Sequence, residues 1–134
     1  MLTKRDILIG GIFLYWGEES KSSNCLTALS NTDPNALKFF IKWLSLFGIK
    51  KEDLRVKLHL YKDMNITDEL AYWAKELKLP LSCFQKPYIK DSYLSGITYK
   101  NGFGHGTCNI RYFHKDMWQY WTAALKYIRG KSVV

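Results

Sequence analysis

Two adjacent carboxylates, Glu18 and Glu19, end the apolar run GGIFLYWGEES. Thr3 and Asp6 form a capping-box-like pair that predicts a helix starting just before this run. The two acids then lie at the helix C-terminus, where the macrodipole disfavours a negative charge by about 0.3–1 kcal/mol. Either another role selects these acids, or they are simply solvated where the helix frays.

Glycines on the same helix indicate what that other role is. Gly10, Gly11 and Gly17 stand among bulky residues, and each costs up to about 1 kcal/mol relative to alanine. Such glycines are expected where another backbone comes close. If that backbone belongs to a second copy of the helix, packed through these glycines and Leu14, a two-fold axis places two Glu18 carboxylates side by side. Paired carboxylates repel unless a divalent cation lies between them, and the expected chemistry is metal-assisted phosphodiester hydrolysis.

A second group of residues has types that contact nucleic acid. Two candidate strands alternate apolar and polar side chains, as half-buried strands do. Their polar sides consist of Arg55, Lys57, His59 and Tyr61, and of Thr107, Asn109 and Arg111. Most often such a side is only the wet face of an antiparallel sheet. However, arginine pairs with guanine and asparagine with adenine in the major groove, which admits a two-stranded ribbon. Together with Lys86 of a third candidate strand, these are the expected DNA-binding residues.

The length of the chain indicates the number of domains, and its net charge indicates the kind of partner. The chain has 134 residues, which corresponds to one domain over residues 1–134. Twenty Lys and Arg residues against twelve Asp and Glu residues give a formal charge of +8. This surplus favours a polyanionic partner and salt-sensitive association, although it also keeps an ordinary basic protein dispersed.

The cysteines indicate a reducing compartment. Cys25, Cys83 and Cys108 are odd in number, widely spaced and without a CxxC pair, so we expect thiols that serve as small core hydrophobes in a cytoplasmic protein. His105 and Cys108 have a ligand-like HxxC spacing, but two further zinc ligands are missing from the pattern.

The N-terminal segment imitates a signal peptide, because two basic residues precede the apolar run. Against export, Asp6 interrupts the junction and no A-x-A-like cleavage site follows. The run is also far shorter than the roughly 20 residues needed to span a bilayer. We therefore expect the segment to belong to the fold and the protein to have no membrane partner.

Hydrophobic periodicity, together with capping and turn residues, predicts alternating helices and strands with no linker or repeat between them. Beyond the first helix, helices are expected over residues 33–48, 67–79 and 115–130, and strands over residues 24–31, 54–61, 82–89 and 105–113. The helix at 33–48 is the clearest, since Asp33 is a good N-cap, Pro34 suits the first helical position and Gly48 suits the end.

This order of elements, with a helix that ends in LYWGEES, resembles the LAGLIDADG homing endonuclease family, as a compact, divergent member with a single motif. Aligned without gaps, GIFLYWGEE of residues 11–19 matches LAGLIDADG. The alignment places Gly17 at the small residue before the catalytic acid and Glu18 at that acid. Phe13 stands at the motif's first glycine, which shifts the close helix packing to Gly10 or Gly11.

The resemblance implies an α+β fold, with helices packed on one face of an antiparallel sheet whose other face reads DNA. It implies Glu18 as the catalytic acid, and Glu18 with Glu19 as ligands of Mg²⁺ (or Mn²⁺). Because a single motif implies a homodimer, the expected target is a near-palindromic double-stranded DNA site.

Three function classes follow from these observations. The first is a homodimeric, magnesium-dependent homing-type endonuclease that makes a double-strand break. The second is a non-cleaving DNA- or RNA-binding protein on the same scaffold, such as a transcription regulator or splicing helper, in which the acids merely finish a dimer helix. The third is a basic domain whose dimer serves assembly alone.

Overall fold

The computed structural model describes residues 1–18, 25–91 and 104–132. The helices of this described part are α1 (Lys4–Glu18), α2 (Pro34–Ser45), α3 (Ile66–Leu77) and α4 (Lys115–Ser132). Its strands are β1 (Leu26–Asn31), β2 (Arg55–Tyr61), β3 (Tyr88–Lys90) and β4 (Thr107–Phe113). The predicted α+β class is confirmed.

The strands form one sheet in the order β1-β4-β2-β3. β4 runs antiparallel to both β1 and β2, but β3 runs parallel to β2. The prediction of an antiparallel sheet is therefore wrong at this edge, and the sheet is mixed. The reason is the helical connection, because α3 lies between β2 and β3 in the chain, and a helical crossover returns the next strand in the same direction.

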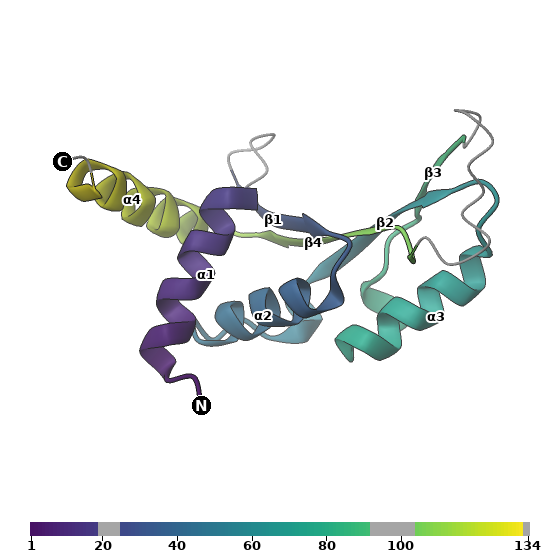
Figure 1. The fold of residues 1–134 in the computed structure, drawn as a ribbon, viewed down its shortest axis with the longest axis horizontal. Coiled ribbons are helices and arrows are strands. Elements are labelled where there is room, and N and C mark those ends of the chain that lie inside the picture. The colour runs from purple at the N-terminus through teal and green to yellow at the C-terminus, as the bar shows by residue number, and fades with distance from the viewer. Residues whose placement is uncertain (19–24, 92–103, 133–134) are drawn as a thin grey trace.

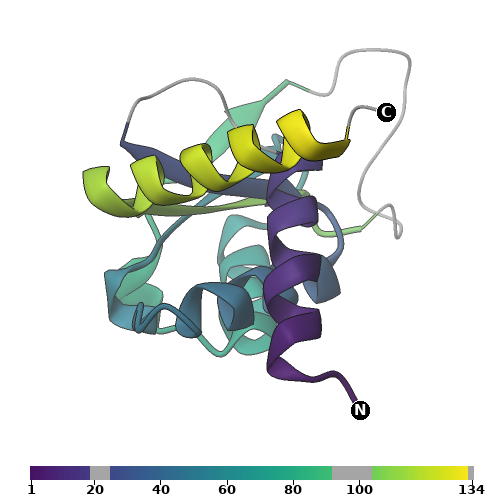
Figure 2. The ribbon, with the colours of Figure 1, turned by 90° about the vertical axis from the view of Figure 1, so that its left-hand side faces the viewer.

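The helices cover one side of this sheet. Figure 1 shows α1, α2 and α3 on the same side of the strands, whereas α4 extends beyond the end of β4. In Figure 2, α4 crosses in front of the sheet and lies transverse to α1. On the other side of β4 and β2, no helix of the described residues covers the strands. Among the described residues, one face of the sheet therefore carries no helix.

Local signals explain most of the element boundaries. The Thr3 backbone N–H donates to the Asp6 carboxylate (2.7 Å) and the Asp6 N–H donates to the Thr3 hydroxyl (3.2 Å), so the predicted capping box is confirmed. Asp33 caps α2 as predicted, by accepting from the Asn35 N–H (2.9 Å). For α3 the expected start is wrong by one residue, because Asn65 accepts from the Asp68 N–H and the helix begins at Ile66.

The strand expected over residues 82–89 is much shorter than predicted. Residues Leu81–Cys83 form a 3₁₀ turn, Phe84 makes an isolated bridge to Val56, and regular pairing starts only at Tyr88. Pro87 has no N–H to donate, which explains why a ladder does not continue through it.

An aromatic cluster joins α1, α2 and α4 on the helical side of the sheet. The indole of Trp43 lies 5.1 Å from that of Trp121 and 6.1 Å from the ring of Tyr15, measured between ring centroids. All three side chains are almost fully buried. The indole N–H of Trp121 donates to the buried Thr27 hydroxyl of β1 (2.8 Å), which fixes α4 against the sheet. Aromatic pairs at this spacing stabilise a core by about 0.5–1.5 kcal/mol beyond the area they bury.

Two of the cysteines are core residues, as predicted. Cys83 and Cys108 are buried, and Cys25 is half-buried. Burial raises the pKa of the Cys108 thiol to about 12, because a thiolate would lose its hydration there. Cys108 is therefore a packing residue on the helical side of β4 and not a reactive thiol.

Candidate nucleic-acid interface

The strand register brings the predicted polar residues onto one face. In β2 and β4, Arg55 pairs with Arg111, Lys57 with Asn109 and His59 with Thr107. The residues between them, such as Val56 and Ile110, are fully buried on the helical side. We name the open side the polar sheet face, and its polar residues include Ser30, Arg55, Lys57, His59, Tyr88, Thr107, Asn109 and Arg111.

The polar sheet face is hollowed at its centre. A depression of about 290 Å³ spans all four strands. Its lining consists of Leu26, Ala28, Ser30, Lys57, His59, Tyr88, Asn109 and Arg111. Short side chains of β1 form one part of the lining, and long basic side chains of β2 and β4 form another. The structure thus gathers four of the predicted DNA-binding residues, Lys57, His59, Asn109 and Arg111, in one place.

The charges of this face have one sign. The four described strands contain no Asp or Glu. Burial, followed by the positive charges of Lys90, Lys57 and Arg111, lowers the pKa of His59 below its ordinary value of 6.5. Arg55 and Arg111 are direct cross-strand partners, and like charges in that position are destabilising. A polyanion on this face would relieve the repulsion.

Two side chains of the hollow are already oriented. The Asn109 amide donates to the Ser30 hydroxyl (2.7 Å), which fixes the amide plane and leaves its carbonyl and second N–H for a base edge. The Arg111 guanidinium lies 5.5 Å from the Phe113 ring centroid, and its Nη1 donates to the side-chain amide oxygen Oε1 of Gln85 (3.4 Å). Its buried Nε has no hydrogen-bond partner among the described residues.

Four predicted residues lie outside the hollow. The Arg55 guanidinium donates to the backbone carbonyls of Glu52 (2.9 Å) and Leu54 (2.7 Å) and so turns back on its own strand. Tyr61, at the far end of β2, packs partly against the core. Lys86 is exposed in the connection before β3, and Thr107 lies beside His59 at the rim.

Sequence reasoning missed the contributions of β1 and β3. Ser30 and Ala28 pair with Asn109 and Arg111, so β1 supplies one side of the hollow. Tyr88 of β3 pairs with His59, and their rings lie 5.6 Å apart. A strand was expected over residues 24–31, but its residues LTALSN at 26–31 do not alternate apolar and polar types, and no pattern in the sequence places β1 next to β4.

The glycines of α1 have a partner inside the chain. A Cβ on Gly11 would lie 2.1 Å from the Trp43 indole, and one on Gly10 would lie 2.9 Å from the Phe39 ring, both on α2. The prediction that these glycines admit a second copy of the helix is therefore wrong, because side chains of α2 occupy the space. Leu14 also packs against the chain's own core.

A different side of α1 faces outward. Ile9 and Phe13, one turn apart, are 45% and 50% exposed, and a Cβ on Gly17 would meet nothing within 4 Å. We name Ile9, Phe13 and Gly17 the outer stripe of α1. A helix that is apolar on all sides is normally buried, so the partial exposure of the outer stripe marks it as an apolar surface of α1 that a second molecule could cover.

The predicted acids stand at the end of α1. Glu18 is its last residue, although the Glu18 side chain and the whole of Glu19 lie outside the described part of the chain. Figure 1 shows this end of α1 level with the sheet, while the N-terminal end lies well below it. Elsewhere in the described residues, no three His, Cys, Asp or Glu side chains come together to hold a metal ion.

No family model, curated protein or solved structure matches the chain. The likeness to LAGLIDADG endonucleases therefore rests on the motif and the order of elements alone. Within the described ranges, no helix combines the length and apolar character that crossing a bilayer requires.

Proposed function

We propose that the protein binds double-stranded DNA with its polar sheet face. The observation that carries this proposal is the hollow in which Lys57, His59, Asn109 and Arg111 meet without a carboxylate in any of the four described strands. Lysine and arginine contact phosphates, while an oriented asparagine amide and an arginine fork match base edges. Strands on a sheet face that no described helix covers can enter the major groove, which is about 12 Å wide.

We further propose that two copies act together and that the pair is a metal-dependent endonuclease. Each copy would supply one Glu18 carboxylate, so a site built from one acid of each copy would need the dimer. Packing through the outer stripe of α1 would bring the two C-terminal ends, and with them Glu18, toward the symmetry axis. Mg²⁺ or Mn²⁺ held there would activate water and stabilise the leaving oxygen of a phosphodiester.

Binding is tested by fluorescence anisotropy with a randomised duplex over a salt series. Lys57→Ala should weaken binding and reduce the salt slope by about one phosphate contact. Lys75→Ala, an exposed lysine of α3 on the helical side, is the matched control and should leave both nearly unchanged. If Lys57→Ala and Arg111→Ala both bind like the parent at every salt concentration, the sheet is not the DNA surface.

Cleavage is tested on the same library with and without Mg²⁺ or Mn²⁺. Glu18→Gln keeps the shape and removes the charge, so cleavage should fall by orders of magnitude while binding is kept. Glu19→Gln is the control, and loss of activity in that variant alone would show that the motif alignment is wrong by one residue. A parent protein that binds but never cuts would leave the non-cleaving DNA-binding protein as its function.

A further inference from the structure

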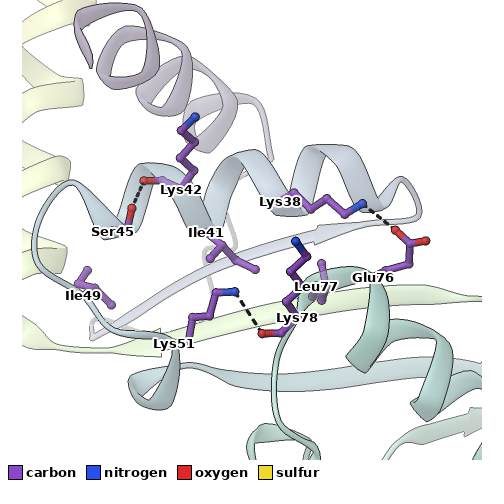
Figure 3. A pocket seen from close by; sticks show the side chains of 9 residues that line it. All are labelled: Lys38, Ile41, Lys42, Ser45, Ile49, Lys51, Glu76, Leu77 and Lys78. Carbon is purple, nitrogen blue, oxygen red and sulfur yellow. Dashed lines mark hydrogen bonds and ion pairs between the residues drawn. The ribbon is translucent and has the colours of Figure 1, made fainter. Parts of the chain in front are cut away.

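A pocket of about 390 Å³ lies on the helical side of the sheet, between α2 and α3. Figure 3 shows its lining, which comes from the two helices and the connections that follow them. The lining residues are Lys38, Ile41, Lys42, Ser45, Ile49, Lys51, Glu76, Leu77 and Lys78. This volume is within the range of about 300–1,000 Å³ that is typical of small-molecule sites.

The floor of the pocket is apolar. Ile41, Ile49 and Leu77 are nearly buried, with 2–8% of their surface exposed. The described lining includes no aromatic side chain, so the floor offers aliphatic contact. Covering it with the carbon skeleton of a ligand would remove the remaining apolar surface from water.

The rim is cationic. Four lysines stand against one carboxylate, and that carboxylate, Glu76, is already paired with Lys38 at 2.7 Å. The hydrogen bond and the charge of Lys38 lower the pKa of Glu76, so it is ionised and committed to this pair at neutral pH. The positive charges of the other three lysines are left without a carboxylate in the described lining.

Two of these lysines point between the helices. Lys51 donates to the Lys78 carbonyl (3.1 Å), an uncharged acceptor that leaves the ammonium charge uncompensated. Figure 3 shows the ammonium groups of Lys51 and Lys78 between α2 and α3, next to Ile41 and Leu77. Lys78 occupies the left-handed C-cap of α3 (φ 54°), which sets the direction in which its side chain leaves the backbone. Two cations beside an apolar floor suit a ligand that has both features.

From this combination we infer that the pocket binds a small organic anion, in which a carboxylate or phosphate meets Lys51 and Lys78 and an apolar body covers Ile41, Ile49 and Leu77. Two classes of ligand have this combination of an anionic group and an organic body: medium-chain carboxylates and mononucleotides. The inference does not depend on DNA binding, because the pocket and the polar sheet face lie on opposite sides of the sheet.

The test is a titration of protein labelled at its isoleucine δ1 methyl groups, followed by NMR. Octanoate and AMP are the probes, with inorganic phosphate and adenosine as controls for charge alone and body alone. We expect octanoate, AMP or both to shift the Ile41 and Ile49 methyls saturably, with a Kd of about 1 mM or tighter. The methyls of Ile66 and Ile89, which lie outside the pocket, should not move. Binding of octanoate indicates a carboxylate ligand, and binding of AMP indicates a nucleotide ligand.

Lysine variants inside and outside the pocket distinguish binding at this site from nonspecific attraction of anions to a basic protein. Lys51→Met and Lys78→Met should each weaken binding by about tenfold, the effect of one charge-assisted hydrogen bond. Lys75→Met removes another exposed lysine, which lies on α3 outside the pocket, and should not weaken binding. The inference is overturned if neither organic anion shifts Ile41 and Ile49, if inorganic phosphate shifts them equally at equal concentration, or if both pocket variants bind like the parent.

Discussion

Gly11→Ala is the most informative single change in α1. Alanine normally stabilises a helix interior by about 1 kcal/mol relative to glycine. Here the new methyl group would lie 2.1 Å from two atoms of the Trp43 indole, whereas ordinary contact begins near 3.4 Å. The indole or the helix would have to move by more than about 1 Å, a displacement that close-packed interiors resist. The clash should therefore outweigh the gain in propensity.

The surroundings of Trp43 set the size of the effect. Its indole is 1% exposed, and the rings of Phe40, Phe47 and Trp121 lie 5.8, 5.4 and 5.1 Å away. Overpacking costs about 1–3 kcal/mol, and because the indole is enclosed by these rings, the cost here should lie in the upper part of that range, about 2–3 kcal/mol. After the gain in helix propensity is subtracted, we expect a net destabilisation of about 1–2 kcal/mol. In urea this lowers the unfolding midpoint by roughly 0.5–1 M at a typical m-value of about 2 kcal/mol/M.

Two neighbouring glycines serve as controls in the same urea experiment. Gly17→Ala meets open space and should raise the free energy of unfolding by up to about 1 kcal/mol. Gly10→Ala approaches only the tip of the half-buried Phe39 ring, at 2.9 Å, and should be nearly neutral because that ring can turn aside. If Gly11→Ala proved as stable as Gly17→Ala, α1 would not pack on α2 as described.

Three further predictions concern the core, the polar sheet face and the outer stripe. Thr27→Val removes the acceptor of the Trp121 indole N–H, so it should cost about 1–3 kcal/mol, and a double-mutant cycle with Trp121→Phe should show strong coupling. Because the pKa of His59 is lowered in the folded protein, the unfolded chain binds more protons as the pH falls through 6.5. The free energy of unfolding should therefore decrease as the pH is lowered through this window. In urea titrations at different pH values, His59→Gln should show a weaker dependence of this free energy on pH. Phe13→Arg should convert a dimer to a folded monomer in light scattering, while Ile66→Arg, at a residue of α3 that is 42% exposed, should not. A dimer that survives Phe13→Arg would exclude the outer stripe as the interface.

The predicted surface could be read from the sequence because side chains along a strand alternate strictly. Lys57 and His59 had to lie opposite Val56 and Leu58, whatever the neighbours of β2 were. The alternation could not show which strands adjoin, so the place of β1 beside β4 and the parallel edge of β3 were missed. Strand order depends on how helices fill the other face, and that is a property of the whole chain.

The glycines of α1 show a second limit of sequence reasoning. Gly10 and Gly11 did mark a close approach, but the sequence could not identify the partner. A wide indole and a phenyl ring on α2 need the space that a second α1 was expected to fill. Large aromatic side chains project far from their own backbone, so a glycine can serve a side chain of the same chain as readily as another helix.

The side chains of β2 alternate between the buried core and the polar sheet face, and this alternation allows the binding tests to be interpreted. Lys57 lies between Val56 and Leu58, which are both fully buried, but its own side chain points to the opposite face. Shortening it to alanine leaves every core contact of the strand in place, so a loss of DNA affinity in Lys57→Ala would report on the surface and not on the fold. Lys51 and Lys78 lie in the helical layer, on the far side of the same sheet. A variant set that impairs DNA binding at one face and organic-anion binding at the other, each without the other effect, would therefore establish two independent sites on one small domain.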